Sequence, residues 1–178
     1  MYVMIPGRGF VKNLTTASVC LALCLVLPFL TGQVPEIGGM LCPMHLPVLL
    51  AGFLCGPWWA LPVGAVAPIL RFVLFGMPPL FPTGAAMCLE LAAYGLVSGV
   101  LYRRLPKGTV TLYGALVGAM VSGRIVWGVM MVILSGISET PFTWGVFLAG
   151  AFWNAIPGIV LQLLLIPAVV TALRRAKA

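Results

Sequence analysis

Charged side chains are scarce in this chain. Only 7% of its 178 residues are charged, and only three residues are Asp or Glu. Soluble domains carry about 25% charged residues, so this composition excludes a soluble enzyme and a disordered tail. Hydrophobic residues make up 62% of the chain, and its mean hydropathy is +1.15. We therefore expect lipid to be the main solvent of the folded chain.

The sequence patterns of nucleotide hydrolysis and of common hydrolytic enzymes are missing as well. There is no GxxxxGK[ST], GxSxG or HExxH, which excludes a P-loop, a nucleophile elbow and a zinc-protease helix. The five cysteines form no CxxC pair, and we interpret them as small apolar side chains. Cys42 and His45 alone are too few ligands for a metal site. The sequence therefore predicts no enzyme, no cofactor and no metal.

Long apolar runs divide the chain into candidate membrane helices. Because a spanning helix needs about 20 apolar residues, we predict an all-α integral membrane protein, one domain over residues 1–178 with six spans. The spans are expected at about residues 13–30, 45–55, 60–75, 85–102, 110–134 and 142–173. Prolines within several spans predict kinks. Residues 31–44 predict an ordered loop, and three prolines argue against a helix over residues 76–84.

The basic residues test this span count. Eight of the ten are expected on one side of the membrane: Arg8, Lys12, Arg103, Arg104, Lys107, Arg174, Arg175 and Lys177. The loops expected on the opposite side contain Glu36 and Glu139 but no Lys or Arg. Because positive residues favour the cytoplasmic side, the pattern predicts both termini in the cytoplasm.

Three charged residues remain inside the predicted spans. Arg71, Glu90 and Arg124 would lie roughly 6, 8 and 15 Å from the outer helix ends, at 1.5 Å per residue. Charged groups at such depths face a protein interior or a wet cavity and often mark a substrate path. All three could border one cavity open to the outside. Structural ion pairs, Arg71 with Glu90 or Arg124 with Glu90, are alternatives that the sequence leaves open.

Residues at helical spacing extend this candidate cavity. Tyr94 is four residues after Glu90, and Trp127 is three after Arg124, so each pair shares a helix face. Asn154 lies on a glycine-rich face of the last span and could donate hydrogen bonds, although such faces also serve helix packing. His45, at the edge of a loop, could cover a ligand or lie at the interface. The candidate substrate-binding residues are thus His45, Arg71, Glu90, Tyr94, Arg124, Trp127 and Asn154.

The stretch from Met44 to Tyr102 resembles a known family. HLPVLLAGFLCGP, the Gly-Ala-x-x-Pro of the third span, GMPPLFP and ELAAYG are similar to the middle of the substrate-binding S components of energy-coupling factor (ECF) vitamin transporters. The resemblance covers about a third of the chain closely. It implies six helices, cytoplasmic termini in a bacterial cell membrane, and a ligand site near the outer face roofed by the first loop.

The resemblance also implies partners and a cargo. The partners would be a transmembrane T protein and two cytoplasmic ATPases, docked through small residues on the first helix. The family's Ala-x-x-x-Ala is replaced here by Ser18-x-x-x-Ala22. The cargo would be a water-soluble vitamin or precursor. Two buried arginines against one glutamate would suit an anion such as pantothenate, whereas aromatic residues and Glu90 would suit a flat heterocycle. A stand-alone secondary transporter or channel is the alternative, and a small membrane enzyme is a third class.

Overall fold

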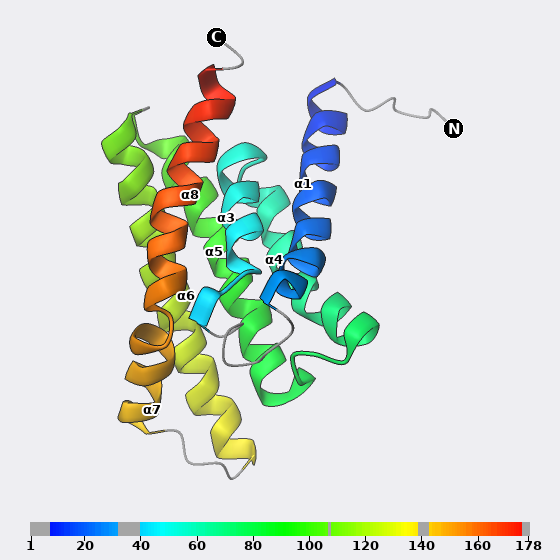
Figure 1. Cartoon of the computed structure of the whole chain (residues 1–178), viewed down its shortest axis with the longest axis vertical. Coiled ribbons are helices and arrows are strands. Elements are labelled where there is room, and N and C mark those ends of the chain that lie inside the picture. The colour runs from blue at the N-terminus through cyan, green and yellow to red at the C-terminus, as the bar shows by residue number, and fades with distance from the viewer. Residues whose placement is uncertain (1–7, 32–39, 107, 139–142, 176–178) are drawn as a thin grey trace.

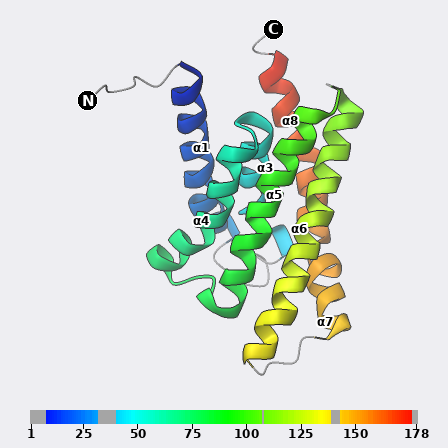
Figure 2. The ribbon, with the colours of Figure 1, turned by 180° about the vertical axis from the view of Figure 1, so that it is seen from behind.

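The computed structural model describes residues 8–31, 40–106, 108–138 and 143–175. These residues form a bundle of helices joined by short connections, without a β-strand among them (Figures 1 and 2). The elements are α1 (Arg8–Val26), a 3-10 turn η1 (Leu27–Thr31), α3 (His45–Leu54), α4 (Pro57–Phe75), a π turn η2 (Leu80–Gly84), α5 (Ala85–Arg104), α6 (Thr109–Ser138), α7 (Trp144–Leu148), a π turn η3 (Ala149–Trp153) and α8 (Ile156–Arg175).

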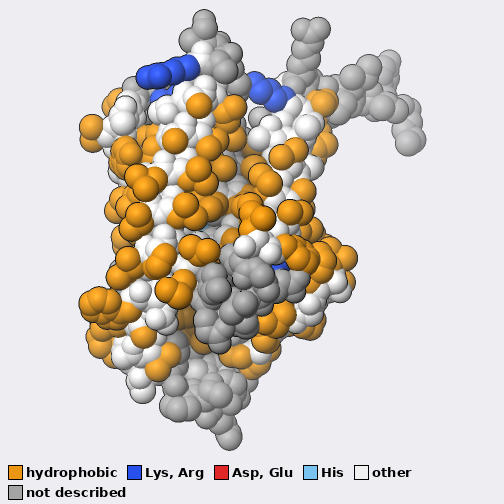
Figure 3. Space-filling view, viewed as in Figure 1, with side chains coloured by type: hydrophobic (Ala, Val, Ile, Leu, Met, Phe, Trp, Pro, Cys, Tyr) orange, Lys and Arg blue, Asp and Glu red, His pale blue; other side chains and the backbone are white. Residues whose placement is uncertain are grey.

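Five helical segments within the described residues are long and apolar enough to cross a membrane. The second predicted span differs, because α3 has only 10 residues and is therefore about 15 Å long. It begins about halfway along the bundle and runs toward the end that holds both termini (Figure 1). The all-α membrane fold is thus confirmed, while a sixth full crossing stays a prediction. Basic side chains gather at the end with the termini (Figure 3), as the charge pattern requires.

Two predicted segments have a different form in the structure. The last span, expected as one helix over 142–173, consists of α7, η3 and α8, with a break at Asn154–Ala155. Pro157 lies just after this break and cannot donate a backbone hydrogen bond, so an interruption here follows from the sequence. Residues 80–84 carry π-type turns although no helix was expected there, but Phe81 within them is extended, with φ −126° and ψ 135°.

Glycines let α4 and α5 approach to backbone contact. On α5, Gly95 and Gly99 form a small-xxx-small face of the kind that packs membrane helices closely. A Cβ at Gly95 would lie 2.7 Å from the carbonyl oxygen of Ala60. In the other direction, Gly64 of α4 lies directly over the backbone at Leu91. No side chain separates the two helices at these points.

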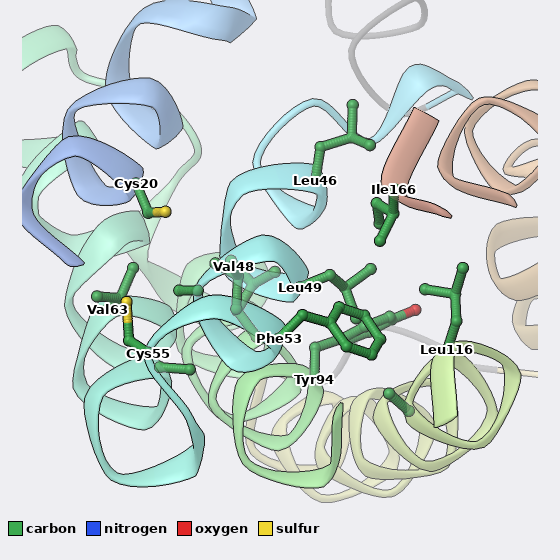
Figure 4. Close-up of a cluster of buried hydrophobic side chains, with 14 of the residues drawn as sticks. Cys20, Leu46, Val48, Leu49, Phe53, Cys55, Val63, Tyr94, Leu116 and Ile166 are labelled. Atoms are coloured by element: carbon green, nitrogen blue, oxygen red, sulfur yellow. The ribbon is translucent and has the colours of Figure 1, made fainter. Parts of the chain in front are cut away.

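The short helix α3 is held by packing in the core and by a hydrogen bond at its C-terminal end. Its buried residues pack in one apolar core with α4, α5, α6 and α8, where Leu46, Leu49, Tyr94 and Ile166 lie close together (Figure 4). At the end of α3, the Arg103 guanidinium donates a 2.7 Å hydrogen bond to the carbonyl oxygen of residue 55. This bond ties the C-terminal end of α3 to the end of α5. The N-terminal end of α3, which carries His45, lies about halfway along the bundle (Figure 1).

Candidate substrate site

A buried ion pair joins α5 to α6. Arg124 Nη1 donates a 3.0 Å hydrogen bond to Glu90 Oε1, and the two residues are only 9% and 1% exposed. His45 Nε2, at the start of α3, lies 3.3 Å from the same carboxylate oxygen. Three predicted site residues from three helices therefore meet at one point. Charged groups so far from water require such pairing, because burial of a single charge is costly.

The segment before α3 closes this cluster from the side of the first loop. Cys42 Sγ accepts a 3.4 Å hydrogen bond from Arg124 Nη2, and the backbone carbonyl of Cys42 accepts one from the His45 N–H at 3.0 Å. Tyr94 places its ring edge-on against the His45 imidazole, with centroids 5.0 Å apart. Residues 32–39, which include most of the predicted roofing loop, lie outside the described residues.

Arg71 lies elsewhere, so the predicted alternative of an Arg71–Glu90 ion pair is not what the structure forms. Its Nη1 donates a 2.9 Å hydrogen bond to the Leu25 carbonyl near the end of α1. Its guanidinium carbon lies 5.5 and 5.6 Å from the ring centroids of Phe29 and Phe75. Arg71 thus joins the end of α1 to α4, because a freed helix carbonyl and two aromatic faces are good partners for a guanidinium. A direct substrate contact by Arg71 stays a prediction.

Trp127 takes part in a row of aromatic rings between α6 and the broken last span. Its ring stacks on Phe147 at 6.1 Å, and Phe147 stacks on Trp144 at 5.1 Å. An apolar groove runs along this row, lined by Ile125, Gly128, Val129, Val132, Thr143, Trp144 and Phe147. Asn154 follows at the break before α8, where its side chain is exposed rather than buried. The structure therefore does not bring Asn154 into the ion-pair cluster.

The predicted docking residues lie on the outer surface of the first helix. Ser18 and Ala22 are both exposed and are one turn apart on α1, while Ala17 and Cys20 on the other face pack into the core. This placement leaves a small-residue stripe accessible to a partner helix. Docking itself stays a prediction.

Two buried residues at this level of the bundle were not selected from the sequence. Cys42 was interpreted as packing, yet it hydrogen bonds to Arg124. Its three-residue spacing from His45 was the available signal. Gln162 of α8 is likewise not among the candidate residues, yet it is 1% exposed. A lone polar residue in an apolar run was the signal there, since such residues rarely face lipid.

Comparisons with known proteins agree on one family. The model of the ECF transporter substrate-specific component family matches residues 12–170. A solved structure described as "Structure and mechanism of the S component of a bacterial ECF transporter" is similar, with a TM-score of 0.60 and 26% sequence identity, covering 93% of this chain and 94% of that one. No curated protein sequence matches the chain significantly.

Proposed function

Because this chain belongs to the family of ECF transporter substrate-specific components, we propose that it is the high-affinity, membrane-embedded binding subunit of an ECF-type ABC importer. Its cargo would be a water-soluble vitamin or vitamin precursor. The observation that carries the proposal is the buried cluster of Glu90, Arg124 and His45. A polar site enclosed by apolar helices and covered by a loop segment suits the capture of a small polar molecule.

The chemistry of the cluster suits binding rather than catalysis. Its charged groups neutralise one another, and Tyr94, edge-on against His45, supplies a flat apolar contact. Two arginines against one glutamate favoured an anion such as pantothenate, but Arg71 bonds to the Leu25 carbonyl instead. Among the described residues, one arginine and one glutamate remain at the cluster, so the preference for an anion has to be tested against neutral vitamins.

Ligand binding by the purified chain is the direct test. Isothermal titration in detergent against riboflavin, folate, thiamine, biotin, pantothenate and cobalamin should find at least one vitamin with submicromolar affinity. The bound vitamin should be recovered chemically unchanged after prolonged incubation. Turnover of the ligand would favour a membrane enzyme, and absence of binding by every vitamin would refute the proposed cargo.

The proposed partners are a transmembrane T protein and two cytoplasmic ATPases. The exposed pair Ser18 and Ala22 supports docking on α1, because small residues let membrane helices approach closely. Affinity purification of the tagged chain from its native membrane should recover the three partners in stoichiometric amounts. Uptake of the bound vitamin in vesicles without any ATPase would instead support the alternative, a stand-alone secondary transporter or channel.

We place the chain in a bacterial cell membrane with both termini in the cytoplasm. Gly9 and Gly136 offer matched reporter positions at opposite ends of the bundle, since a Cβ at either would meet no atom within 4 Å. In a background without the native cysteines, Gly136→Cys should react with an impermeant thiol reagent added outside, and Gly9→Cys only after the membrane is opened. The reverse pattern would overturn the proposed orientation.

A further inference from the structure

Gln162 is a buried polar side chain whose carbonyl oxygen has no partner in the described part of the chain. It lies on α8, is 1% exposed, and its Oε1 accepts no hydrogen bond there. A buried polar atom without a hydrogen bond costs free energy. We therefore expect Oε1 to have a partner that is not among the described residues. The amide carries no charge, so an ion pair does not explain the burial of this side chain.

The neighbours of Gln162 along α8 place it at the level of the ion-pair cluster. One turn before it, a Cβ at Gly158 would lie 2.7 Å from the backbone oxygen of Met40, so this face of α8 touches the segment that carries Cys42. One turn after it, Ile166 packs in the core with Tyr94 (Figure 4). Residues four apart share a helix face. Gln162 therefore lies between the covering segment and the core beneath the cluster.

The cluster itself keeps unused hydrogen-bonding groups. Arg124 Nε and His45 Nδ1 are buried without a partner among the described residues. The second amino group of Arg124 donates to the Cys42 thiol, which is a weak acceptor. Both contacts of Glu90 use the same oxygen, Oε1. The N–H donors of Arg124 and the Oε1 acceptor of Gln162 could therefore bind a molecule that supplies an acceptor and a donor.

The charges limit what that molecule can be. In the described part of the chain, Glu90 and Arg124 cancel each other, and Arg71 is engaged with α1 and two aromatic rings. A carboxylate ligand would either compete with Glu90 for Arg124 or add an uncompensated negative charge to a buried site. A cationic ligand would compete with Arg124 for Glu90 in the same way. Both outcomes are costly where water is excluded.

We propose that Gln162 is a specificity-determining contact for a ligand without net charge that presents an N–H donor beside a carbonyl acceptor, as the amide edge of a heterocycle does. The ligand N–H donates to Gln162 Oε1, and the ligand carbonyl accepts from Arg124. This inference rests on the proposed function and names the substrate class of the same site.

Matched acid and neutral probes test the charge class. Isothermal titration of the purified full chain would compare nicotinate with nicotinamide, biotin with biotinamide, and pantothenate with pantothenol, together with neutral riboflavin and cationic thiamine. The tightest binder should carry no net charge. In any pair that binds, the neutral member should bind at least about tenfold more tightly. An acid or thiamine as the tightest binder would overturn the class, whereas binding neither by these probes nor by any of the six vitamins tested above would refute the proposed cargo itself.

The role of Gln162 is tested by Gln162→Met, which keeps the length of the side chain and removes its amide. Affinity for the tightest neutral probe should fall about tenfold or more, the usual effect of losing a buried hydrogen bond. The melting temperature without ligand should stay unchanged or rise, because an unpartnered polar atom is removed. Leu164→Met, at a lipid-exposed position of the same helix, is the control and should change neither quantity. Unchanged affinity in Gln162→Met would remove Gln162 from the site.

Discussion

Two helix interfaces in this molecule use glycine in opposite ways. Between α4 and α5, Gly64 and Gly95 bring backbone against backbone. Between α6 and the last span, Gly128 and Gly150 make room for aromatic rings, those of Phe147 and Trp127 respectively. The first interface cannot yield without moving whole helices, whereas rings in the second can rotate. The comparison indicates a rigid scaffold on one side of the bundle and an adjustable wall on the other.

The ion pair lies where these two halves meet. Glu90 belongs to α5 of the rigid interface, and Arg124 belongs to α6 of the adjustable one. Because removing one partner of a buried pair leaves an unpaired charge, a change at either residue should disturb the contact between the halves strongly. A ligand bound at the proposed site would contact both halves, which would be a physical route from binding to a change in helix arrangement.

The largest effect is expected from breaking that connection. Arg124→Met should destabilise the protein by about 3–5 kcal/mol, because Glu90 is then left as a buried, unpaired charge. Thermal unfolding in detergent measures the loss. Adding Glu90→Gln should recover much of it, since the double variant has no charge to bury. A single variant as stable as the parent would contradict an ion pair between the halves.

A smaller loss is expected from one methyl group in the rigid interface. Gly95→Ala should cost about 1–3 kcal/mol, because its Cβ would lie 2.7 Å from the Ala60 carbonyl oxygen and the backbones must separate. The midpoint of thermal unfolding and the monodisperse yield report the change. Gly114→Ala is the matched control, since a Cβ there meets no atom within 4 Å, and its higher helix propensity should leave stability equal or greater.

The same change in the adjustable interface should be milder. At Gly128 the added Cβ meets only the ring of Phe147, which can swing aside, so Gly128→Ala should cost less than about 1 kcal/mol. Its effect should appear instead in the fluorescence of Trp127 and Trp144, whose ring row is displaced. A loss equal to that of Gly95→Ala would show that the two interfaces are equally rigid.

The smallest effect on stability is expected outside both interfaces. Ser18→Leu on the exposed face of α1 should change stability by no more than about 0.5 kcal/mol and should leave vitamin binding intact. Recovery of the T protein with the tagged variant should fall sharply, because a large side chain blocks close helix approach. Loss of binding with retained assembly would mean that α1 serves the ligand site rather than docking.

The sequence alone predicts the membrane class, the approximate helices and the residues that must be buried together. Scarce charge requires a lipid environment, and three ionisable residues within apolar runs require partners or a polar cavity. Long apolar runs predict helices here because every backbone N–H and C=O group in lipid must find its hydrogen-bond partner within the helix. The family resemblance, found in one third of the chain, agrees with a family match over residues 12–170.

The pairing of the charged residues follows from the tertiary structure and not from the sequence. From the sequence, Glu90 could pair with Arg71 or with Arg124, because depth along a helix does not fix the direction in which a side chain points. The end of α1 provides Arg71 with a carbonyl and two rings, which frees Glu90 for Arg124. The exposure of Asn154 likewise follows from the break before α8. Burial of Gln162 depends on contacts between residues more than 100 positions apart, such as those of Gly158 with Met40, which local patterns do not encode.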